Sequence, residues 1–168
     1  MAVHQISIFG WSVLPDATGR AFFETYAIKA TNDLFRHLVG VLADPAASEA
    51  HGFYGVFGVP KNFVGSAAFK VYWTSTGTSG NVKFDLDYRA VASGESLDAS
   101  SFQQQLTATV AAPGSTDVLQ VATLTPTSAN FAADDLVEFY LTREDGGGTD
   151  TLAAEITIHG VFFEYADA

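Results

Sequence analysis

The sequence predicts an all-β protein, an antiparallel β-sandwich that forms a single domain. The clearest observation is the segment 81–90, in which polar and apolar residues alternate without exception. Successive side chains of a strand point to opposite faces, so this period of two predicts one core face and one surface face. Length and composition agree, because 168 residues fit one domain and a hydrophobic content of 48% supplies a packed core.

Strand-like segments recur along nearly the whole chain at about the 8–12-residue spacing of sandwiches and barrels. Turn-forming clusters separate them, for example Pro-Asp-Ala-Thr-Gly at 15–19 and Asp-Gly-Gly-Gly at 145–148. Residues 31–38 could form a short helix, but Val-Gly-Val at 39–41 favours a strand, and 43–50 is expected to be a loop with a helical turn. Strands are expected at 4–9, 21–29, 35–42, 53–59, 67–75, 81–92, 103–110, 118–124, 135–143 and 153–165.

The parity of apolar residues assigns a core face to several of these strands. The residues expected in the core are Phe69, Val71, Trp73, Val137, Phe139, Leu141, Ile156, Ile158 and Phe162. Adjacent aromatic pairs such as Phe22 and Phe23 leave some strands apolar on both faces. A two-layer sandwich must cover such a second face, so we expect a further subunit or a host surface there.

Composition excludes several classes of protein. The net charge is −11, and the clustered cations that neutralise phosphates are missing, so no direct contact with nucleic acid is expected. Because the chain has no cysteine, it has no disulfides, thiolate metal sites or cysteine nucleophile, which fits synthesis in a reducing cytoplasm. No apolar run approaches the ~20 residues of a membrane span, and no basic leader precedes one, so neither a membrane segment nor a signal segment is expected.

Motifs for catalysis and metal binding are also missing. No GxSxG elbow and no phosphate-binding glycine loop occurs. The four histidines, His4, His37, His51 and His159, show none of the spacings of metal ligands. Two clusters of acidic residues could donate oxygens to calcium, although a solvated turn is favoured for both. One comprises Asp134, Asp135 and Glu138, and the other comprises Glu144, Asp145 and Asp150. We expect no enzyme activity, no cofactor and no metal.

Asp85 and Asp87 share one face of their strand, as in a carboxylate pair for acid–base catalysis. The flanking Lys83 and Arg89 are expected to keep both carboxylates ionised, and a general acid needs a raised pKa instead. A ladder of charges on the outer face of the sheet is therefore expected.

Two regions of the sequence resemble jelly-roll structural proteins of tailed bacteriophages. The first comprises 59–65, 69–75 and 78–89. The second comprises 129–135, a strand that ends at Arg143, residues 150–154 and a last strand that closes at 163–165. The resemblance covers roughly residues 55–165 and rests on strand and turn patterns. It implies a jelly-roll sandwich that serves as a capsid cement or decoration subunit, a head fibre or a tail-associated receptor binder.

This resemblance predicts a non-enzymatic virion protein that binds the major capsid protein and stabilises the outer surface of a phage head. It further implies a homo-oligomer, expected to be a trimer, that is made in the host cytoplasm. The alternative is a carbohydrate- or receptor-binding module of a phage fibre or tail, in which Trp11, Tyr26, Tyr54 or Tyr72 would stack on sugars. A secreted polysaccharide-active enzyme is disfavoured by the missing carboxylate pair and signal segment.

Residues 1–50 lie outside this resemblance and are expected to form an N-terminal arm and first strands that carry attachment. Residues 51–168 would form the jelly-roll sandwich, within one continuous domain. The candidate residues of a capsid or subunit interface are Ile6, Ile8, Phe9, Trp11, Val13, Phe22, Tyr26 and Tyr54. An ordinary first strand of the sandwich is the alternative interpretation of the opening segment.

Overall fold

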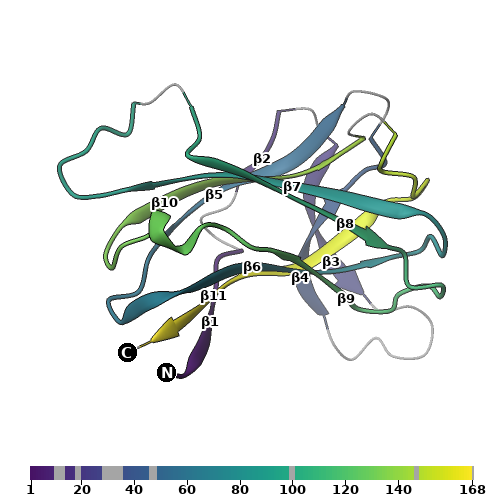
Figure 1. Ribbon diagram of the computed structural model, residues 1–168. Helices are drawn as coiled ribbons and strands as arrows, with labels where there is room; N and C mark the ends of the chain where they lie inside the picture. Colours follow the sequence, from purple (N-terminus) through teal and green to yellow (C-terminus); the bar gives the residue numbers. More distant parts are fainter. Residues whose placement is uncertain are drawn as a thin grey trace.

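Antiparallel pairing joins the strands of this chain into two sheets that pack face to face as a jelly-roll sandwich (Figure 1). The structure is a computed structural model, and it describes residues 1–9, 14–17, 20–27, 36–45, 49–98, 101–145 and 148–167. The side chains of 25–27 and 36 are outside this description. The predicted all-β, single-domain sandwich is confirmed.

The first sheet has six strands, in the order β3-β4-β11-β6-β9, with β1 paired to β11 beside the end of β4. Their bounds are β1 (Val3–Ser7), β3 (Ala21–Ala27), β4 (Arg36–Leu42), β6 (Phe63–Ser75), β9 (Gln120–Leu124) and β11 (Ile156–Asp167). In the described part of the chain, no helix is long and apolar enough to cross a membrane.

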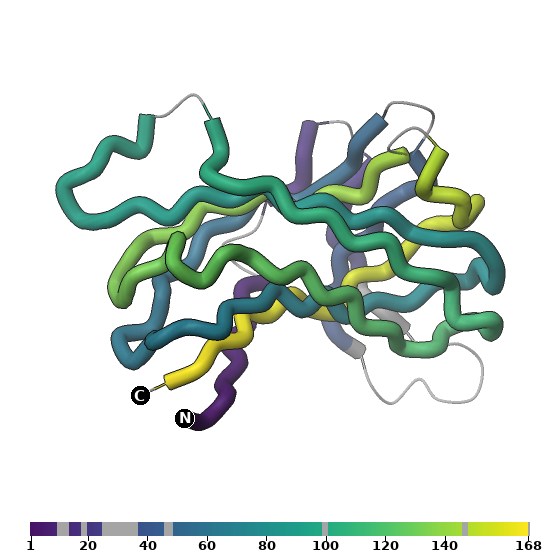
Figure 2. Tube along the Cα trace, viewed as in Figure 1, coloured from purple at the N-terminus to yellow at the C-terminus, as the bar shows by residue number. Residues whose placement is uncertain are grey.

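The second sheet has five strands, in the order β2-β5-β10-β7-β8. Their bounds are β2 (Leu14–Pro15), β5 (Ala50–Gly58), β7 (Asn81–Val91), β8 (Gln104–Ala111) and β10 (Leu136–Glu144). A short 3-10 helix, η1 (Ser128–Asn130), precedes β10. Figure 2 shows β8 and β9 running along the same side of the sandwich, one in each sheet.

Every segment in which the sequence predicts a strand contains one. β6 begins at Phe63 rather than at residue 67, and the two-residue strand β2 was not predicted because it is too short for alternation to show. β4 confirms the strand interpretation of 36–42. Residues 31–35 and 46–48, where a helix or helical turn was considered, lie outside the described residues.

A β-bulge in β11 changes which of its residues face the core. The pairing with β6 shifts between Ile158 and Gly160, so one extra residue enters β11 and the parity of the following side chains reverses. The prediction that Phe162 lies in the core is therefore wrong, and Phe162 lies on the outer face of the sheet, where its ring packs against Tyr72. The inward residues after the bulge are Val161, Phe163 and Tyr165.

Arg143 is a charged residue within the apolar interior. Its side chain is fully buried, and its guanidinium donates to both carboxylate oxygens of Asp150, from Nε to Oδ2 at 2.9 Å and from Nη2 to Oδ1 at 2.8 Å. It also donates to the carbonyl oxygens of Leu152 and Ala154, the latter at 2.6 Å. Because every buried charge needs such partners, Arg143 ties β10 to the segment that leads into β11.

Candidate functional site

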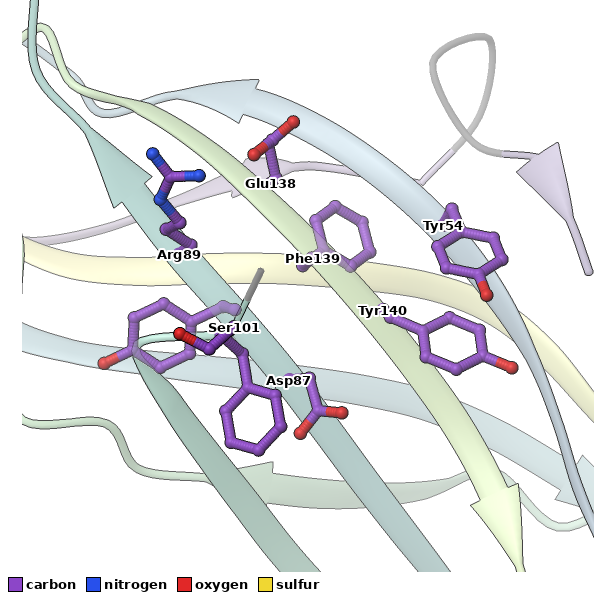
Figure 3. A pocket seen from close by; sticks show the side chains of 9 residues that line it. Tyr54, Asp87, Arg89, Ser101, Glu138, Phe139 and Tyr140 are labelled. Atoms are coloured by element: carbon purple, nitrogen blue, oxygen red, sulfur yellow. The ribbon is translucent and has the colours of Figure 1, made fainter. Parts of the chain in front are cut away.

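An open pocket of about 400 Å³ lies on the outer face of the five-stranded sheet, over its three central strands (Figure 3). β5, β10 and β7 form its floor, and residues just before β8 form one side. It is lined by Tyr54, Asp87, Tyr88, Arg89, Ser101, Phe102, Glu138, Phe139 and Tyr140. Aromatic rings and ionisable groups thus meet in one exposed hollow.

The strand register places five residues in a continuous row across the whole sheet. Leu14 of β2 pairs with Tyr54 of β5, and Tyr54 pairs with Tyr140 of β10. Tyr140 pairs with Asp87 of β7, which pairs with Gln105 of β8. Directly opposite side chains on one face of antiparallel strands are close neighbours, so the row forms one surface with apolar and aromatic groups at one end and polar groups at the other.

Tyr54 and Tyr140 form a rigid aromatic pair at the centre of this row. Their rings stack with centroids 4.0 Å apart and planes 10° apart, and Tyr54 remains 50% exposed. The hydroxyl of Tyr140 donates to Asp16 Oδ2 at 3.3 Å, and the same oxygen accepts the backbone N–H of Gly52 at 2.6 Å. A Cβ at Gly52 would lie only 2.9 Å from the Tyr140 ring. A larger residue at position 52 would therefore crowd this ring.

The hydroxyl of Tyr140 keeps its proton across the usual pH range. Burial raises its pKa far above the ordinary value, and the neighbouring Tyr54 and Asp16 raise it further. Tyr140 therefore stays a neutral hydrogen-bond donor that holds its ring in place.

Asp87 presents a polar atom without a protein partner. Its Oδ1 is buried and accepts no hydrogen bond from the described residues. Burial raises the pKa of Asp87 and the nearby charge of Asp85 adds to this, while a hydrogen bond with the Gln105 side chain opposes both. A buried polar atom without a partner is costly, and such atoms mark places where a ligand or water supplies the missing hydrogen bond.

The expectation that Arg89 keeps Asp87 ionised is wrong. The guanidinium of Arg89 donates instead to the carbonyl oxygens of Ser96 and Leu97, the latter at 3.3 Å, in the segment that follows β7. The sequence places Arg89 two residues from Asp87 on the same face, but the carbonyl groups of the loop take its donors. Asp87 therefore has no ion-pair partner in Arg89, and its Oδ1, like that of Asp85, is buried without a hydrogen bond from the described part of the chain.

The segment between β7 and β8 rises beside the pocket. In Figure 1 its described residues, 92–98 and 101–103, project from the five-stranded sheet, away from the six-stranded one. Side chains fix its two ends, because Glu95 accepts the backbone N–H of Ala92 at 3.0 Å and Gln103 accepts that of Ala90 at 3.1 Å. Phe102, which lines the pocket, is 53% exposed. This ring adds a second exposed aromatic surface near Asp87.

Asp85 belongs to a buried ion cluster rather than to a solvated ladder. Only 3% of it is exposed, and Lys83 Nζ lies 2.9 Å from its Oδ2 while also contacting Glu144. Burial tends to raise the pKa of Asp85, but hydrogen bonds with Glu144, Thr107 and Lys83 bring it below the ordinary value. The prediction that Asp85 stays ionised agrees with this direction, whereas the prediction of an exposed outer ladder is wrong for Asp85.

Several of the groups considered for metal binding have other partners. Within the described residues, no three His, Asp or Glu side chains are placed to hold a metal ion together. Asp150 binds Arg143, and Asp135 accepts the backbone N–H of Ala132 at 2.7 Å. His37 Nε2 lies 2.9 Å from His159 Nδ1, a contact between two side chains on the outer face of the six-stranded sheet.

The candidate interface residues of the opening segment divide into two groups. Ile8 is buried, and Ile6 and Phe9 pack against the same core. β1, which contains Ile6, pairs with β11 as a strand of the six-stranded sheet. Trp11 and Val13 lie outside the described residues. The role of residues 1–50 in attachment stays a prediction, although β1 to β4 are strands of the two sheets.

The other candidate interface residues do not come together in one place. Phe22 is 38% exposed on the outer face of the six-stranded sheet, and Tyr54 lies on the opposite face of the sandwich. Tyr26 falls within β3, but its side chain is outside the described residues. Among the candidate residues whose side chains the structure describes, Tyr54 alone lines the pocket described above.

Comparison with solved structures shows that the chain has the fold of carbohydrate-binding modules. CBM35 from Cellvibrio japonicus Abf62 is 13% identical, with a TM-score of 0.51 over 99% of both chains. The CBM22-1 xylan-binding domain from Paenibacillus barcinonensis Xyn10C is 9% identical, with a TM-score of 0.53 over 98% of this chain and 94% of the other. No family model matches the sequence, and no curated protein is significantly similar to it.

A similar sandwich also occurs within a larger enzyme. The arabinose-bound GH51 α-L-arabinofuranosidase is 12% identical, with a TM-score of 0.53 over 92% of this chain. The chain spans 23% of the length of that enzyme, and 99% and 94% of the two modules named above.

These structures correct the expectation of a phage virion protein. Three structures that align over nearly all of both chains are carbohydrate-binding modules, so the assignments to phage jelly-roll proteins and to capsid cement or decoration are wrong. The strand and turn patterns that carried the resemblance are shared by jelly-roll sandwiches of unrelated function. The alternative expectation was a carbohydrate- or receptor-binding module of a phage fibre or tail, and these folds support it better than the capsid role, in its carbohydrate-binding part.

Proposed function

We propose that this protein is a non-catalytic carbohydrate-binding module that holds a neutral glycan on the outer face of its five-stranded sheet. The observation that carries the proposal is the row from Leu14 to Gln105, with the stacked pair Tyr54 and Tyr140 beside the unpartnered oxygen of Asp87. A sugar ring has an apolar face of C–H groups and a rim of hydroxyl groups. An exposed aromatic ring can pack against the C–H face, and a fixed carboxyl or amide group can form hydrogen bonds with the hydroxyl groups.

The charge of the site supports a neutral ligand. Two carboxyl groups, of Asp87 and Glu138, line the pocket, and the protein carries a net charge of −11. The guanidinium of Arg89, which also lines the pocket, donates to carbonyl oxygens of its own loop. The negative charge of the protein would therefore repel glycans with uronate or sulfate groups, and Arg89 would offer them little attraction.

Xylan is the first glycan to test. A domain with the same fold, which aligns over nearly the whole chain, is a xylan-binding domain. Sequence identity to it is 9%, so this likeness guides the choice of probe, and a panel of other neutral polysaccharides belongs in the same experiment.

Replacing Tyr54 with alanine is expected to weaken glycan binding at least tenfold, which corresponds to about 1.4 kcal/mol. The change removes the half-exposed ring and leaves Tyr140 without its stacking partner. Isothermal titration calorimetry with xylan oligosaccharides measures the effect on the dissociation constant.

Tyr72→Ala provides the matched control for this experiment. Tyr72 lies on the outer face of the six-stranded sheet, where its ring packs edge-on against Phe162 at 5.2 Å. The Tyr72→Ala variant is expected to bind xylan oligosaccharides with unchanged affinity. Equal losses for both variants, or unchanged affinity for Tyr54→Ala, would place the site elsewhere.

We expect the stability of Asp87→Asn, measured relative to the unchanged protein, to be greater at pH 7 than at pH 3. The folded state raises the pKa of Asp87, so the stability linked to its proton is present at low pH and is lost as pH rises through the folded pKa. Asparagine does not ionise, so the variant does not lose this stability as the pH rises. Urea unfolding of both proteins at the two pH values measures the difference, and a difference independent of pH would contradict the prediction.

A further inference from the structure

The segment that supplies the strands β8 and β9 on one side of the sandwich carries almost no charge. Between Asp98 and Asp134 the sequence contains one Asp, Glu, Lys or Arg, which is Asp117, although the whole chain has 8 basic and 19 acidic residues. The strands of this segment, β8 and β9, are the last strands of the five-stranded and six-stranded sheets. The net charge of −11 is thus concentrated on the rest of the molecule.

The free edge of β9 lacks the usual protection against pairing. Within the described residues β9 pairs with β6 alone, and that pairing shows no register shift. Its residues, Gln120–Leu124, include no charged residue and no proline. Edge strands commonly carry such residues or a bulge because their unpaired backbone groups otherwise bind another strand. Among the other edge strands, β2 contains Pro15 and β3 contains Glu24, whereas β8 also has no charged residue and no proline. β9 differs from β8 in the apolar side chains exposed beside it.

Apolar side chains are exposed at the same edge. Val118 is 41% exposed, Leu119 is 54% exposed and Val121 is 43% exposed. Figure 2 shows β8 and β9 at the front of the sandwich, with no described segment in front of them. These three neighbouring apolar side chains form a surface whose burial is favourable. Charged groups beside them include Asp117, which precedes Val118, and the Lys70 ammonium, which donates to Thr123 Oγ1 at 3.2 Å.

We propose that β9 pairs in antiparallel fashion with β9 of a second copy of this chain, forming a two-fold symmetric dimer. A second copy carries the same charge of −11, and this side is where two copies meet least repulsion. A cationic partner would be drawn to the acidic remainder of the surface instead. In an isologous contact the same strand faces itself, so backbone groups pair and Val121 lies close to its symmetry mate.

Such a dimer leaves the pocket open. β9 belongs to the six-stranded sheet, whereas the pocket lies on the outer face of the five-stranded sheet. Dimer formation and the proposed glycan binding are therefore independent of each other.

Light scattering coupled to gel filtration tests this proposal at micromolar concentrations. The unchanged protein is expected at about twice the chain mass of 17.8 kDa. Val121→Glu and Leu119→Glu each place like charges across the two-fold axis and are expected to give monomers. Val3→Glu is the matched control: Val3 is 68% exposed on β1, so this variant is expected to remain a dimer.

Three results would overturn the proposal. These are an unchanged protein at the mass of one chain, an oligomer of three or more chains, or a dimer that both glutamate variants retain. Circular dichroism of the variants verifies that each has folded. Added sodium chloride is expected to maintain or strengthen the dimer, because salt screens repulsion between acidic copies, and dissociation by salt would instead indicate an interface of ion pairs.

Discussion

Replacing Arg143 with methionine is expected to lower the free energy of unfolding by about 3–5 kcal/mol, the cost of breaking a buried ion pair. The change leaves the carboxylate of Asp150, whose side chain is 1% exposed, without the guanidinium that binds both of its oxygens. The carbonyl oxygens of Leu152 and Ala154 lose the same donor. Urea denaturation at pH 7, followed by tryptophan fluorescence, measures the loss.

Arg20→Met is the matched control. Arg20 lies 3.8 Å from Glu49, and both side chains are largely in contact with solvent. Exposed pairs of this kind contribute about 0–1 kcal/mol, so a small change is expected. Similar losses for the two variants would mean that Arg143 does not hold the sandwich together as described.

Replacing Phe84 with alanine is expected to lower the free energy of unfolding by about 3–5 kcal/mol through the cavity that it leaves. Phe84 is fully buried, and its ring meets that of Trp73 edge-on at 5.8 Å between the two sheets. Well-packed interiors relax only partly around such a gap, so both the transfer of the ring and the cavity contribute. Chemical denaturation of the variant and the unchanged protein measures the difference.

Phe102→Ala is the matched control, because it makes the same substitution at an exposed position and so tests whether burial causes the loss of stability. Phe102 is 53% exposed beside the pocket, and surface substitutions usually change stability by about 0.5 kcal/mol or less. It is therefore expected to retain the stability of the unchanged protein. If Phe84→Ala cost no more stability than Phe102→Ala, the side chain of Phe84 would not lie in the core, and the inward face of β7 would be wrong.

Alternation was sufficient to predict the strands and most of their inward faces. β7 follows the pattern of residues 81–90 with Val82, Phe84, Leu86 and Tyr88 in the core. The pattern failed at Phe162, because a bulge inserts one residue and a sequence gives no sign of where pairing shifts. Arg143 has the inward parity of Val137, Phe139 and Leu141, but its charge argued against a place in the core. Its partner Asp150 becomes a neighbour only when the chain leaves β10 and turns back, so the sequence did not show how that charge is satisfied.

The candidate site was only partly accessible from the sequence. Tyr54 was a candidate as an exposed aromatic residue, and the parity of Val137, Phe139 and Leu141 was a signal that Tyr140 points outward. The stacked pair could not be predicted, because β5 and β10 are far apart in sequence and their register is set by long-range pairing. Asp87 was misjudged because nearness to Arg89 in sequence suggested an ion pair, while carbonyl groups of the loop bind Arg89 instead.

The central claim is that the outer face of the five-stranded sheet binds a neutral glycan, and nuclear magnetic resonance tests it most directly. A ¹⁵N-labelled sample is titrated with xylan oligosaccharides and with a panel of other neutral glycans, and shifts of the backbone amides are assigned to residues. We expect saturable shifts that cluster around Tyr54, Asp87 and Tyr140, in the pocket shown in Figure 3. Shifts centred on Tyr72 and Phe162 of the opposite face, or none with any glycan of the panel, would contradict it.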